Sequence, residues 1–191
     1  MKREPRKKMI AHLAQLDAAT VRAHSLAVAQ RLATIPAYVA AESLAVYVSF
    51  GTEIETHDLI RQLLTAGRQV CIPTFNDGGY RLAEIQDFDR DLHPGKLAIL
   101  EPKLVRPVPV TRPHVWLVPG LAFDRNGNRL GRGKGYFDAL LARAPGVKIA
   151  LTHDFQLLNE VPTEAHDVRM DFIVTEIQVF QCPRNYELNR H

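Results

Sequence analysis

One stretch of 30 residues restricts the fold more than any other, because it places a helix between two apolar strands. Residues 43–48 and 69–72 are short apolar runs rich in strand-forming residues. Between them, residues 57–66 have the pattern of a helix that Thr56 would cap and Gly67 would end. Two strands joined in this way pair in parallel through a right-handed crossover. We therefore expect an α/β fold.

The rest of the chain continues this alternation of helices and strands. Residues 3–34 have the periodicity of one or two amphipathic helices, and Asp17 is a suitable N-cap for the second. Residues 136–144 predict another helix, which Pro145 and Gly146 would end. Further strands are predicted at residues 80–85, 114–118, 147–151, 172–175 and 178–180. This order predicts a three-layer α/β/α architecture with a mainly parallel central sheet.

Two segments between the strands carry turn-forming residues. Residues 91–113 contain five prolines, so we expect an irregular segment there that borders a cleft. Asp124–Gly127 predicts a tight turn between residues 121–123 and 128–130.

Composition narrows the classes of protein to which the chain can belong. At 191 residues, residues 1–191 are expected to form a single domain. No apolar run approaches the roughly 20 residues that cross a bilayer, so we expect no membrane association. Cys71 and Cys182 lie far apart, which predicts free thiols in the cytoplasm. A net charge of +3 fits an anionic small molecule better than nucleic acid, and we expect a monomer.

The segment from Gly120 to Asp138 points to a polyphosphate ligand. Between residues 127 and 135 it combines four glycines with three cations, and it then runs directly into the predicted helix: Gly127, Gly131, Gly133, Gly135, Arg129, Arg132 and Lys134. Glycines let backbone N–H groups approach an anion closely. Asp138 in the first helical turn is placed to hold a metal ion against that phosphate. The alternative is a structural glycine hairpin with a solvated basic face.

Three common ligand signatures do not fit this segment. A phosphate-binding Walker loop needs Ser or Thr after its lysine, whereas Gly135 follows Lys134. The dinucleotide fingerprint needs two residues between its second and third glycines, and here only one separates Gly133 from Gly135. An EF-hand would need Gly at the position of Arg129 and Glu at that of Gly135.

Phe123–Asp138 as a whole resembles the signature of the 5-formyltetrahydrofolate cyclo-ligase (methenyltetrahydrofolate synthetase) family. Three further segments resemble the same family: residues 2–6, which resemble its ATP-contacting N-terminus, residues 49–56 on its folate side, and residues 161–167, which carry a second metal-associated Asp. Two positions depart from the family pattern. Pro5 stands where Leu is usual, and Phe137 stands where many members have Tyr.

The resemblance implies a fold, a reaction and a set of site residues. The fold would be like that of the NagB, RpiA and CoA-transferase proteins. The reaction would convert 5-formyltetrahydrofolate and MgATP into 5,10-methenyltetrahydrofolate, ADP and phosphate. Catalytic roles would fall to Lys134, Arg132 and Tyr136, and Mg²⁺ would be held by Asp138 and Asp167. ATP would be bound by Lys2, Arg6, Arg129, Leu130, Gly131, Arg132, Gly133, Lys134, Gly135, Tyr136 and Phe137. The folate would be bound by Val48, Glu53, Arg132 and Tyr136.

Other interpretations stay open at this point. Lys2 and Arg6 lie in a basic run of a kind that is usually solvated, and Glu53 can serve as a charge beside a helix start. Asp138 favours a first helical turn without any metal, and Asp167 can simply turn a loop. An isomerase or acyl-transfer enzyme on a similar sheet would use the loop for a substrate phosphate. A nucleic-acid-binding module would need interleaved aromatics, which the loop has only at its end.

Overall fold

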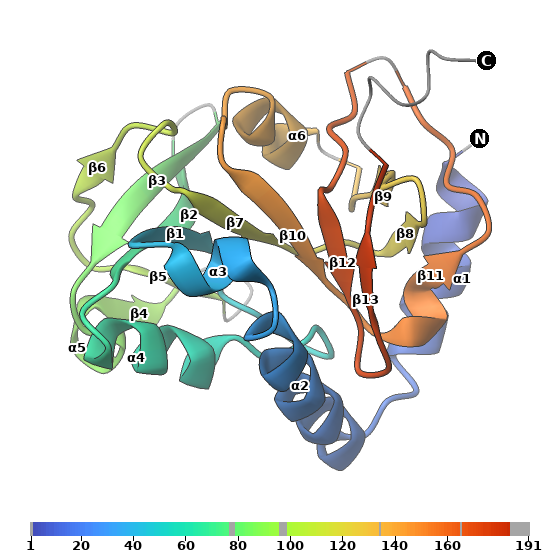
Figure 1. Cartoon of the computed structure of the whole chain (residues 1–191), viewed down its shortest axis with the longest axis horizontal. Coiled ribbons are helices and arrows are strands. Elements are labelled where there is room, and N and C mark those ends of the chain that lie inside the picture. The colour runs from blue at the N-terminus through green and yellow to red at the C-terminus, as the bar shows by residue number, and fades with distance from the viewer. Residues whose placement is uncertain (1, 77–78, 96–98, 134, 165, 184–191) are drawn as a thin grey trace.

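A central eight-stranded sheet organises the computed structural model, which describes residues 2–76, 79–95, 99–133, 135–164 and 166–183 (Figure 1). The strands follow the order β13-β12-β10-β7-β1-β2-β3-β6. Their bounds are β1 Ser43–Val46, β2 Gln69–Asn76, β3 Gly79–Ile85, β6 Pro107–Val108, β7 Val115–Val118, β10 Val147–Leu151, β12 Phe172–Val174 and β13 Val179–Gln181.

The five central strands of this sheet are parallel. β1 pairs in parallel with both β2 and β7, so that Leu44 lies opposite Val70 on one side and Val115 on the other. β7 pairs in parallel with β10, and β10 with β12. Antiparallel strands close both edges, with β13 beside β12, β3 beside β2, and β6 beside β3. The predicted parallel pair and the mainly parallel sheet are both confirmed.

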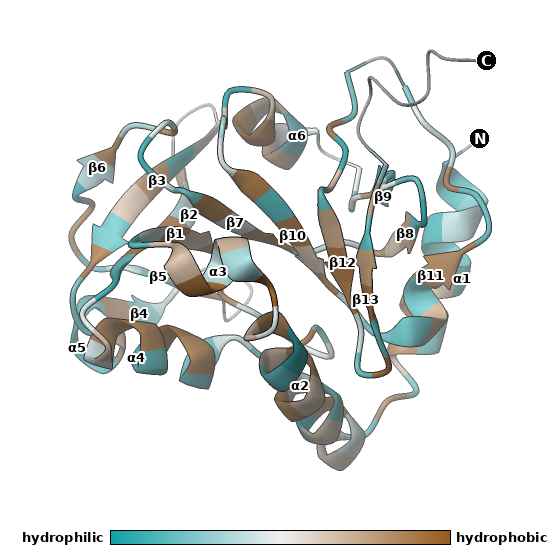
Figure 2. Cartoon of the chain, viewed as in Figure 1, coloured by the Kyte–Doolittle hydropathy of each residue, from teal (hydrophilic) through white to brown (hydrophobic). Residues whose placement is uncertain are grey.

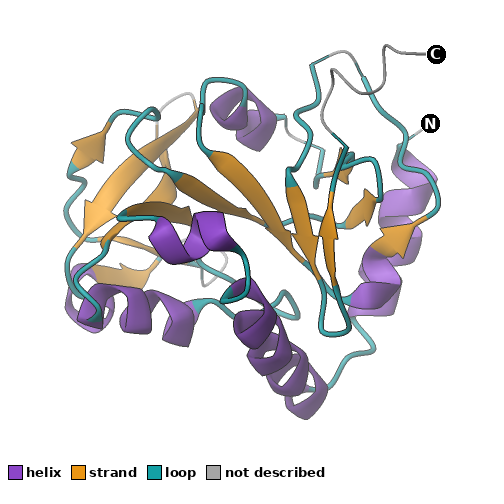
Figure 3. Cartoon of the chain, viewed as in Figure 1, coloured by secondary structure: helices purple, strands orange, loops and turns teal. Residues whose placement is uncertain are grey.

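Helices cover both faces of the sheet, as Figure 3 shows. Helices on one face contribute Leu32, Tyr38 and Ile60 to a core that also contains Leu44. On the other face, Leu141 belongs to a second core. The helices are α1 Arg3–Leu13, α2 Ala18–Leu32, α3 Pro36–Ala40, α4 His57–Thr65, α5 Phe88–Asp91, α6 Tyr136–Leu141 and a short 3₁₀ turn, η2 Asp154–Gln156. The three-layer expectation is confirmed.

The strand sequences account for this two-sided burial. Successive side chains of a strand point to opposite faces, so Leu44 and Val46 join one core while Ala45 joins the other. All four residues of β1 and of β7 are buried, as expected for parallel strands covered on both faces. Figure 2 shows the corresponding apolar colour along the central strands. No helix among the described residues is long and apolar enough to span a membrane.

A smaller three-stranded sheet and α1 stand beside the main sheet. Its strand order is β11-β8-β9, with bounds β11 Leu157–Leu158, β8 Ala122–Asp124 and β9 Arg129–Leu130. α1 packs Met9 and Leu13 against Leu121, Leu130 and Val161. This packing brings the N-terminal residues next to the glycine-rich segment, although the two lie more than 120 residues apart in the sequence.

Most predicted element boundaries are confirmed. The N-terminal segment forms two helices, and the side chain of Asp17 caps α2 by accepting the Thr20 N–H at 2.7 Å. Gly67 follows α4 with a φ of 75°, a conformation that favours glycine. The Asp124–Gly127 turn joins β8 and β9 in an antiparallel hairpin, with Gly127 at φ 83°. Both cysteines are free and buried, and burial raises the pKa of Cys71 to about 11.

Three predictions about local structure are wrong, and one helix was not predicted. Thr56 occupies the N-cap position of α4, but its hydroxyl makes no capping hydrogen bond because it donates to the carbonyl of Tyr47. The segment 91–113 is not wholly irregular, since it contains β6 and the hairpin β4 Leu92–Pro94 and β5 Leu100–Pro102. α6 ends at Leu141 instead of Ala144. The helix α3 lies in a stretch for which no element was predicted.

Candidate functional site

Two loops leave the carboxyl ends of adjacent strands at the middle of the sheet. The loop after β1 covers residues 47–56, and the segment after β7 begins at Pro119. From β1 the chain continues to β2 on one side, whereas β7, β10 and β12 follow on the other. Ligands of open α/β sheets bind at such a reversal of strand order. The folate-side segment and the glycine-rich segment predicted from the sequence therefore meet at this point.

The loop after β1 is fixed by its own hydrogen bonds. The Tyr47 hydroxyl donates to the Ile54 carbonyl at 2.8 Å. Ser49 and Thr56 bond twice, each backbone N–H donating to the other's hydroxyl at 3.0 Å. The Thr56 hydroxyl in turn donates to the Tyr47 carbonyl at 2.7 Å. These groups are buried, so the loop holds one shape before any ligand arrives.

Glu53 stands at the tip of this loop and faces the glycine-rich segment. Its Oε2 accepts the Phe50 N–H at 3.2 Å, and its Oε1 accepts from the Arg132 guanidinium at 3.1 Å. The side chain is only 12% exposed. Burial raises the pKa of Glu53, while the Arg132 charge opposes that shift. Glu53 is thus a largely buried hydrogen-bond acceptor that faces the glycine-rich segment.

Arg132 connects the two loops. Besides its bond to Glu53, its guanidinium lies over the Phe50 ring, with 4.5 Å between the guanidinium carbon and the ring centroid. It remains 48% exposed, so it can change partners without a large desolvation penalty. The structure therefore brings together two residues, Arg132 and Glu53, that the sequence placed on the folate. Phe50 is an aromatic surface beside them.

The glycine-rich segment has backbone geometry that other residues rarely adopt. Gly133 and Gly135 have φ values of 104° and 69°. Arg6 of α1 reaches this segment, and its Nε donates to the Gly131 carbonyl at 2.9 Å. A Cβ atom on Gly133 would lie 3.2 Å from the guanidinium carbon of Arg6. The N-terminal helix thus packs directly on the loop.

Asp124 fixes the hairpin that leads into the loop. It is fully buried, and its Oδ1 accepts the N–H groups of Asn126 and Asn128 at 3.0 and 3.1 Å. Its Oδ2 accepts from the Asn128 side chain and from the Val161 N–H, both at 2.9 Å. From the sequence, Asp124 was predicted only to begin a turn. Its buried role could have been inferred from the two asparagines and the glycine within the next four residues, because such residues accept and donate local hydrogen bonds in turns.

Arg129 lies beneath the loop. Its side chain is 4% exposed, and its guanidinium bonds to Asp138 at 2.6 Å and to the Pro119 carbonyl at 3.0 Å. It also lies 5.4 Å from the centroid of the Phe137 ring. A Cβ atom on Gly131 would come within 3.2 Å of this guanidinium. Arg129 therefore supports the loop from below and neutralises the carboxylate of Asp138.

Lys2, near the N-terminus, forms an ion pair with Asp167, in the C-terminal part of the chain. Their side chains approach to 2.6 Å, and Asp167 also accepts the Glu164 N–H at 2.7 Å. Burial by itself raises the pKa of Asp167, but the Lys2 ammonium and the Glu164 N–H outweigh it and leave the pKa lowered. Ligand atoms of Glu164, His166 and Asp167 lie within 4.8 Å of one another, so this corner can accept a cation.

The remaining predicted residues have mixed positions. Val48 and Leu130 are buried in the cores, so Leu130 can contact a ligand only through its backbone. Trp116 is wholly buried, which agrees with the expectation that it belongs to the core. Lys134 lies outside the described residues. Tyr136 begins α6, and its side chain is likewise outside what the structure describes.

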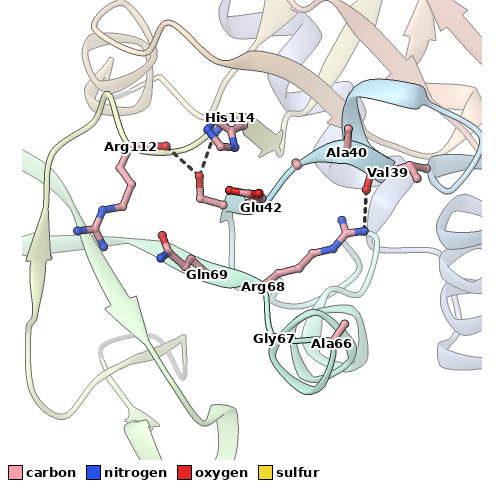
Figure 4. Close-up of a pocket in the computed structure, with 11 residues that line it drawn as sticks. Val39, Ala40, Glu42, Ala66, Gly67, Arg68, Gln69, Arg112 and His114 are labelled. Atoms are coloured by element: carbon pink, nitrogen blue, oxygen red, sulfur yellow. Dashed lines mark hydrogen bonds between the residues drawn. The ribbon is translucent and has the colours of Figure 1, made fainter.

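A separate hollow of about 590 Å³ lies at the opposite edge of the sheet (Figure 4). It opens where β1, β2 and β7 begin, and its lining includes Glu42, Arg68, Gln69, Arg112 and His114. No described residue of the glycine-rich segment lines this hollow. We place the functional site at the carboxyl ends of the strands, because only that edge combines the glycines, the cations and the switch in strand order.

Known proteins resemble this chain along most of its length. The sequence profile of the 5-formyltetrahydrofolate cyclo-ligase family matches residues 1–176. The 5-formyltetrahydrofolate cyclo-ligase of Escherichia coli K12 is 36% identical over 160 residues, which cover 80% of this chain and 88% of that protein. The mouse protein of the same name is 27% identical over 193 residues, covering 92% of this chain and 93% of that protein.

A solved structure agrees with this relationship. The 5,10-methenyltetrahydrofolate synthetase of Aquifex aeolicus superposes with a TM-score of 0.86 at 30% identity, covering 100% of this chain and 98% of that one. Sequence profile, relatives and fold all agree with the signature at Phe123–Asp138. The chain belongs to the 5-formyltetrahydrofolate cyclo-ligase family.

Proposed function

We propose that this protein closes 5-formyltetrahydrofolate to 5,10-methenyltetrahydrofolate at the expense of ATP, releasing ADP and phosphate. The observation that supports this most directly is the contact between Arg132 and Glu53. It joins a glycine-rich, cationic segment to a rigid acceptor loop at the carboxyl ends of β7 and β1. A phosphate donor and a pterin bound to the two loops would meet there.

The chemical difficulty is that a formyl oxygen is a poor leaving group. Transfer of the γ-phosphoryl group from ATP to that oxygen releases ADP and forms an imidate-like phosphate ester. The lone pair of N10 then attacks the formyl carbon and closes the ring. Cleavage of the carbon–oxygen bond releases phosphate, and the N10 proton is lost. The protein's task in such a reaction is to position both substrates and to neutralise charge.

The glycine-rich segment would bind the triphosphate. Gly131, Gly133 and Gly135 would offer backbone N–H groups without side chains of their own, and Lys134 and Arg132 would add positive charge. Arg6 already lies on this segment, and Lys2 is near the same end of the molecule. The predicted contributions of Leu130 and Phe137 would be limited to backbone contacts and to packing.

Arg132 would exchange partners during the reaction. In the ligand-free state it bonds to Glu53. When the phosphates arrive, a move onto the transferring phosphoryl group would release Glu53 to accept the amino and ring N–H groups of the pterin. The 48% exposure of Arg132 makes that exchange possible. Tyr136 and Val48 would form the remaining walls of the folate site.

Asp138 and Asp167 are the proposed carboxylates for Mg²⁺. Mg²⁺ binds few protein carboxylates and keeps several waters, and it would neutralise the phosphate oxygens. Both carboxylates pair with a cation, Arg129 or Lys2, in this structure. Asp167 also has Glu164 beside it, which gives an oxygen-rich corner suited to a hard dication. We further propose that the protein is cytoplasmic, which the two buried free thiols support, and that it is a monomer.

The test is the absorbance of methenyltetrahydrofolate formed from 5-formyltetrahydrofolate, with and without MgATP. We expect product only when MgATP is present, together with one ADP for each ring closed. Product without nucleotide, or ATP hydrolysis without product, would reject the proposal. An Asp138→Asn variant should need more Mg²⁺ for half-maximal rate. An unaltered Mg²⁺ titration in that variant would remove Asp138 from the metal site.

The alternative functions have no observation in their favour. An isomerase or acyl-transfer enzyme would need a general base beside the glycine-rich segment that is free to accept a proton, whereas Glu53 and Asp138 each pair with an arginine. A nucleic-acid-binding module would need aromatic side chains interleaved with the cations. The relatives that match this chain are instead named as cyclo-ligases.

A further inference from the structure

Two histidines and a glutamate converge outside the proposed active site. His24 lies on α2, His153 follows β10, and Glu176 lies in the turn between β12 and β13. Their nearest ligand atoms all lie within 4.8 Å of one another. His153 is fully buried, while the side chains of His24 and Glu176 are 25% and 14% exposed. Three segments far apart in the sequence thus bring metal-ligand side chains to one point.

The spacing of these atoms is close to that around a small dication. Nδ1 of His24 lies 2.9 Å from Nδ1 of His153 and 3.5 Å from Oε1 of Glu176. A tetrahedral zinc ion with bonds of about 2.0–2.1 Å separates its ligand atoms by roughly 3.3 Å. The two observed distances lie on either side of that value. Small side-chain adjustments would therefore admit the ion.

Hydrogen bonds behind the cluster orient its ligand atoms. Nε2 of His153 is 2.9 Å from the Thr52 carbonyl, which can only accept, so this nitrogen carries the proton. Nδ1 of His153 then carries the lone pair, and it lies 2.9 Å from Nδ1 of His24. Oε2 of Glu176 accepts the Asp154 N–H at 2.8 Å, which leaves Oε1 for the cluster. Metal-binding histidines and carboxylates are held in this manner in known sites.

The chemistry of the side chains also suits a metal. Two imidazole nitrogens and one carboxylate oxygen are ligands that zinc takes in proteins. A neutral imidazole is the form that binds metal ions. A dication bound by both Nδ1 atoms requires the His24 ring to carry its proton on Nε2 instead of Nδ1. A single carboxylate, Glu176, would then lie beside a doubly charged ion.

We propose that His24, His153 and Glu176 form a binding site for a zinc-class dication that ties α2 to the turns after β10 and β12. These three residues belong to none of the groups assigned to ATP, folate or Mg²⁺. The site and the proposed function can therefore succeed or fail independently. Three protein ligands leave a fourth position for water. The ion would link α2 to the turns after β10 and β12 and stabilise their packing.

Co²⁺ is the most direct probe, because a tetrahedral Co²⁺ complex absorbs visible light far more strongly than the hydrated ion. We expect the full-length protein, first treated with chelator, to develop this absorption up to one equivalent of Co²⁺. Added Zn²⁺ should abolish it. Zn²⁺ should also raise the melting temperature. Absence of the absorption at saturating Co²⁺ would overturn the proposal.

Variants separate this site from adventitious binding. His24→Gln should lose the Co²⁺ absorption and the Zn²⁺-dependent rise in melting temperature. His166→Gln is the matched control, because it changes an exposed histidine of the other acidic cluster, and it should keep both. If His24→Gln fails to fold, Glu176→Gln preserves the side-chain shape and should weaken Co²⁺ binding at least tenfold. Unchanged binding in the folded variants, or loss in His166→Gln, would contradict the assignment.

Discussion

The two loops of the candidate site are stabilised by different kinds of contact. The loop after β1 is held by buried hydroxyl and backbone groups within itself, with Thr56 and Tyr47 at its centre. The glycine-rich segment is held from outside, by Arg6 on its surface and by the pair of Arg129 and Asp138 beneath it. One loop is therefore a fixed acceptor, while the other depends on ion pairs that an anionic ligand can rearrange.

This difference matches the two ligands proposed for the site. A pterin is a rigid planar ring that needs donors and acceptors at fixed positions, which a pre-formed loop supplies. A phosphoryl group changes its geometry and charge distribution during transfer, so its binding groups must follow it. The contact between Arg132 and Glu53 is the one place where the two kinds of loop bond directly among the described contacts.

Removing the cation beneath the glycine-rich segment should have the largest effect. Arg129→Met leaves the carboxylate of Asp138 without its partner in a nearly buried position. Loss of one member of a buried pair costs about 3–5 kcal/mol, so we expect unfolding in denaturant at a much lower midpoint. Arg143→Met is the control, because Arg143 is exposed near the end of α6. Equal stability of the two variants would show that Arg129 does not support the loop.

Removing the central hydroxyl of the loop after β1 should cost less. Thr56→Val leaves a buried carbonyl at Tyr47 and a buried N–H at Ser49 without their partner. An unsatisfied buried group costs about 1–3 kcal/mol. The same change should raise the KM for the folate more than that for ATP, because only the folate loop is disturbed. Thr65→Val on the exposed side of α4 should alter neither stability nor KM, and a matching loss there would contradict this view.

A variant of Lys134 tests whether the glycine-rich segment takes part in phosphoryl transfer. Lys134→Ala should lower kcat at least about tenfold, which corresponds to roughly 1.4 kcal/mol of barrier. The KM for the folate should change little, since the loop after β1 is untouched. Steady-state rates at saturating folate and ATP measure this effect, with the exposed Lys103→Ala as the control. Unchanged turnover would remove Lys134 from phosphoryl transfer.

The sequence predicted the fold well because its signals are local. Patterns within ten residues are enough to predict the apolar strands β1, β7 and β10. The same holds for α4, the helix that joins the parallel strands β1 and β2. The errors arise where tertiary contacts decide. The hydroxyl of Thr56 binds across its loop instead of capping α4, and the short hairpin of β4 and β5 has no apolar periodicity.

The candidate site was predictable in its glycines and cations and, by the family resemblance, in Glu53. Their spacing is a local signal, and the resemblance to a family supplied their roles. The partners of those residues were not predictable, because they come from remote segments. Lys2 meets Asp167 across 165 residues, and His24 meets His153 across 129 residues. Contacts between residues so far apart leave no pattern in a single sequence. They form because α1 and α2 pack where they do.

The smallest expected effect concerns the pH dependence of stability at Glu53. Burial raises the pKa of Glu53 in the folded state above its unfolded value, despite the opposing charge of Arg132. The stabilisation that results is fully present below the unfolded pKa and is lost as the pH rises through the folded-state pKa. The free energy of unfolding of the wild type, compared with Glu53→Gln, should therefore fall as the pH rises above the unfolded-state pKa of about 4.3. Denaturant unfolding at several pH values measures this difference. A difference that instead grows with pH would mean that the Arg132 pair outweighs burial, and that the acceptor loop, like the phosphate loop, depends on an ion pair.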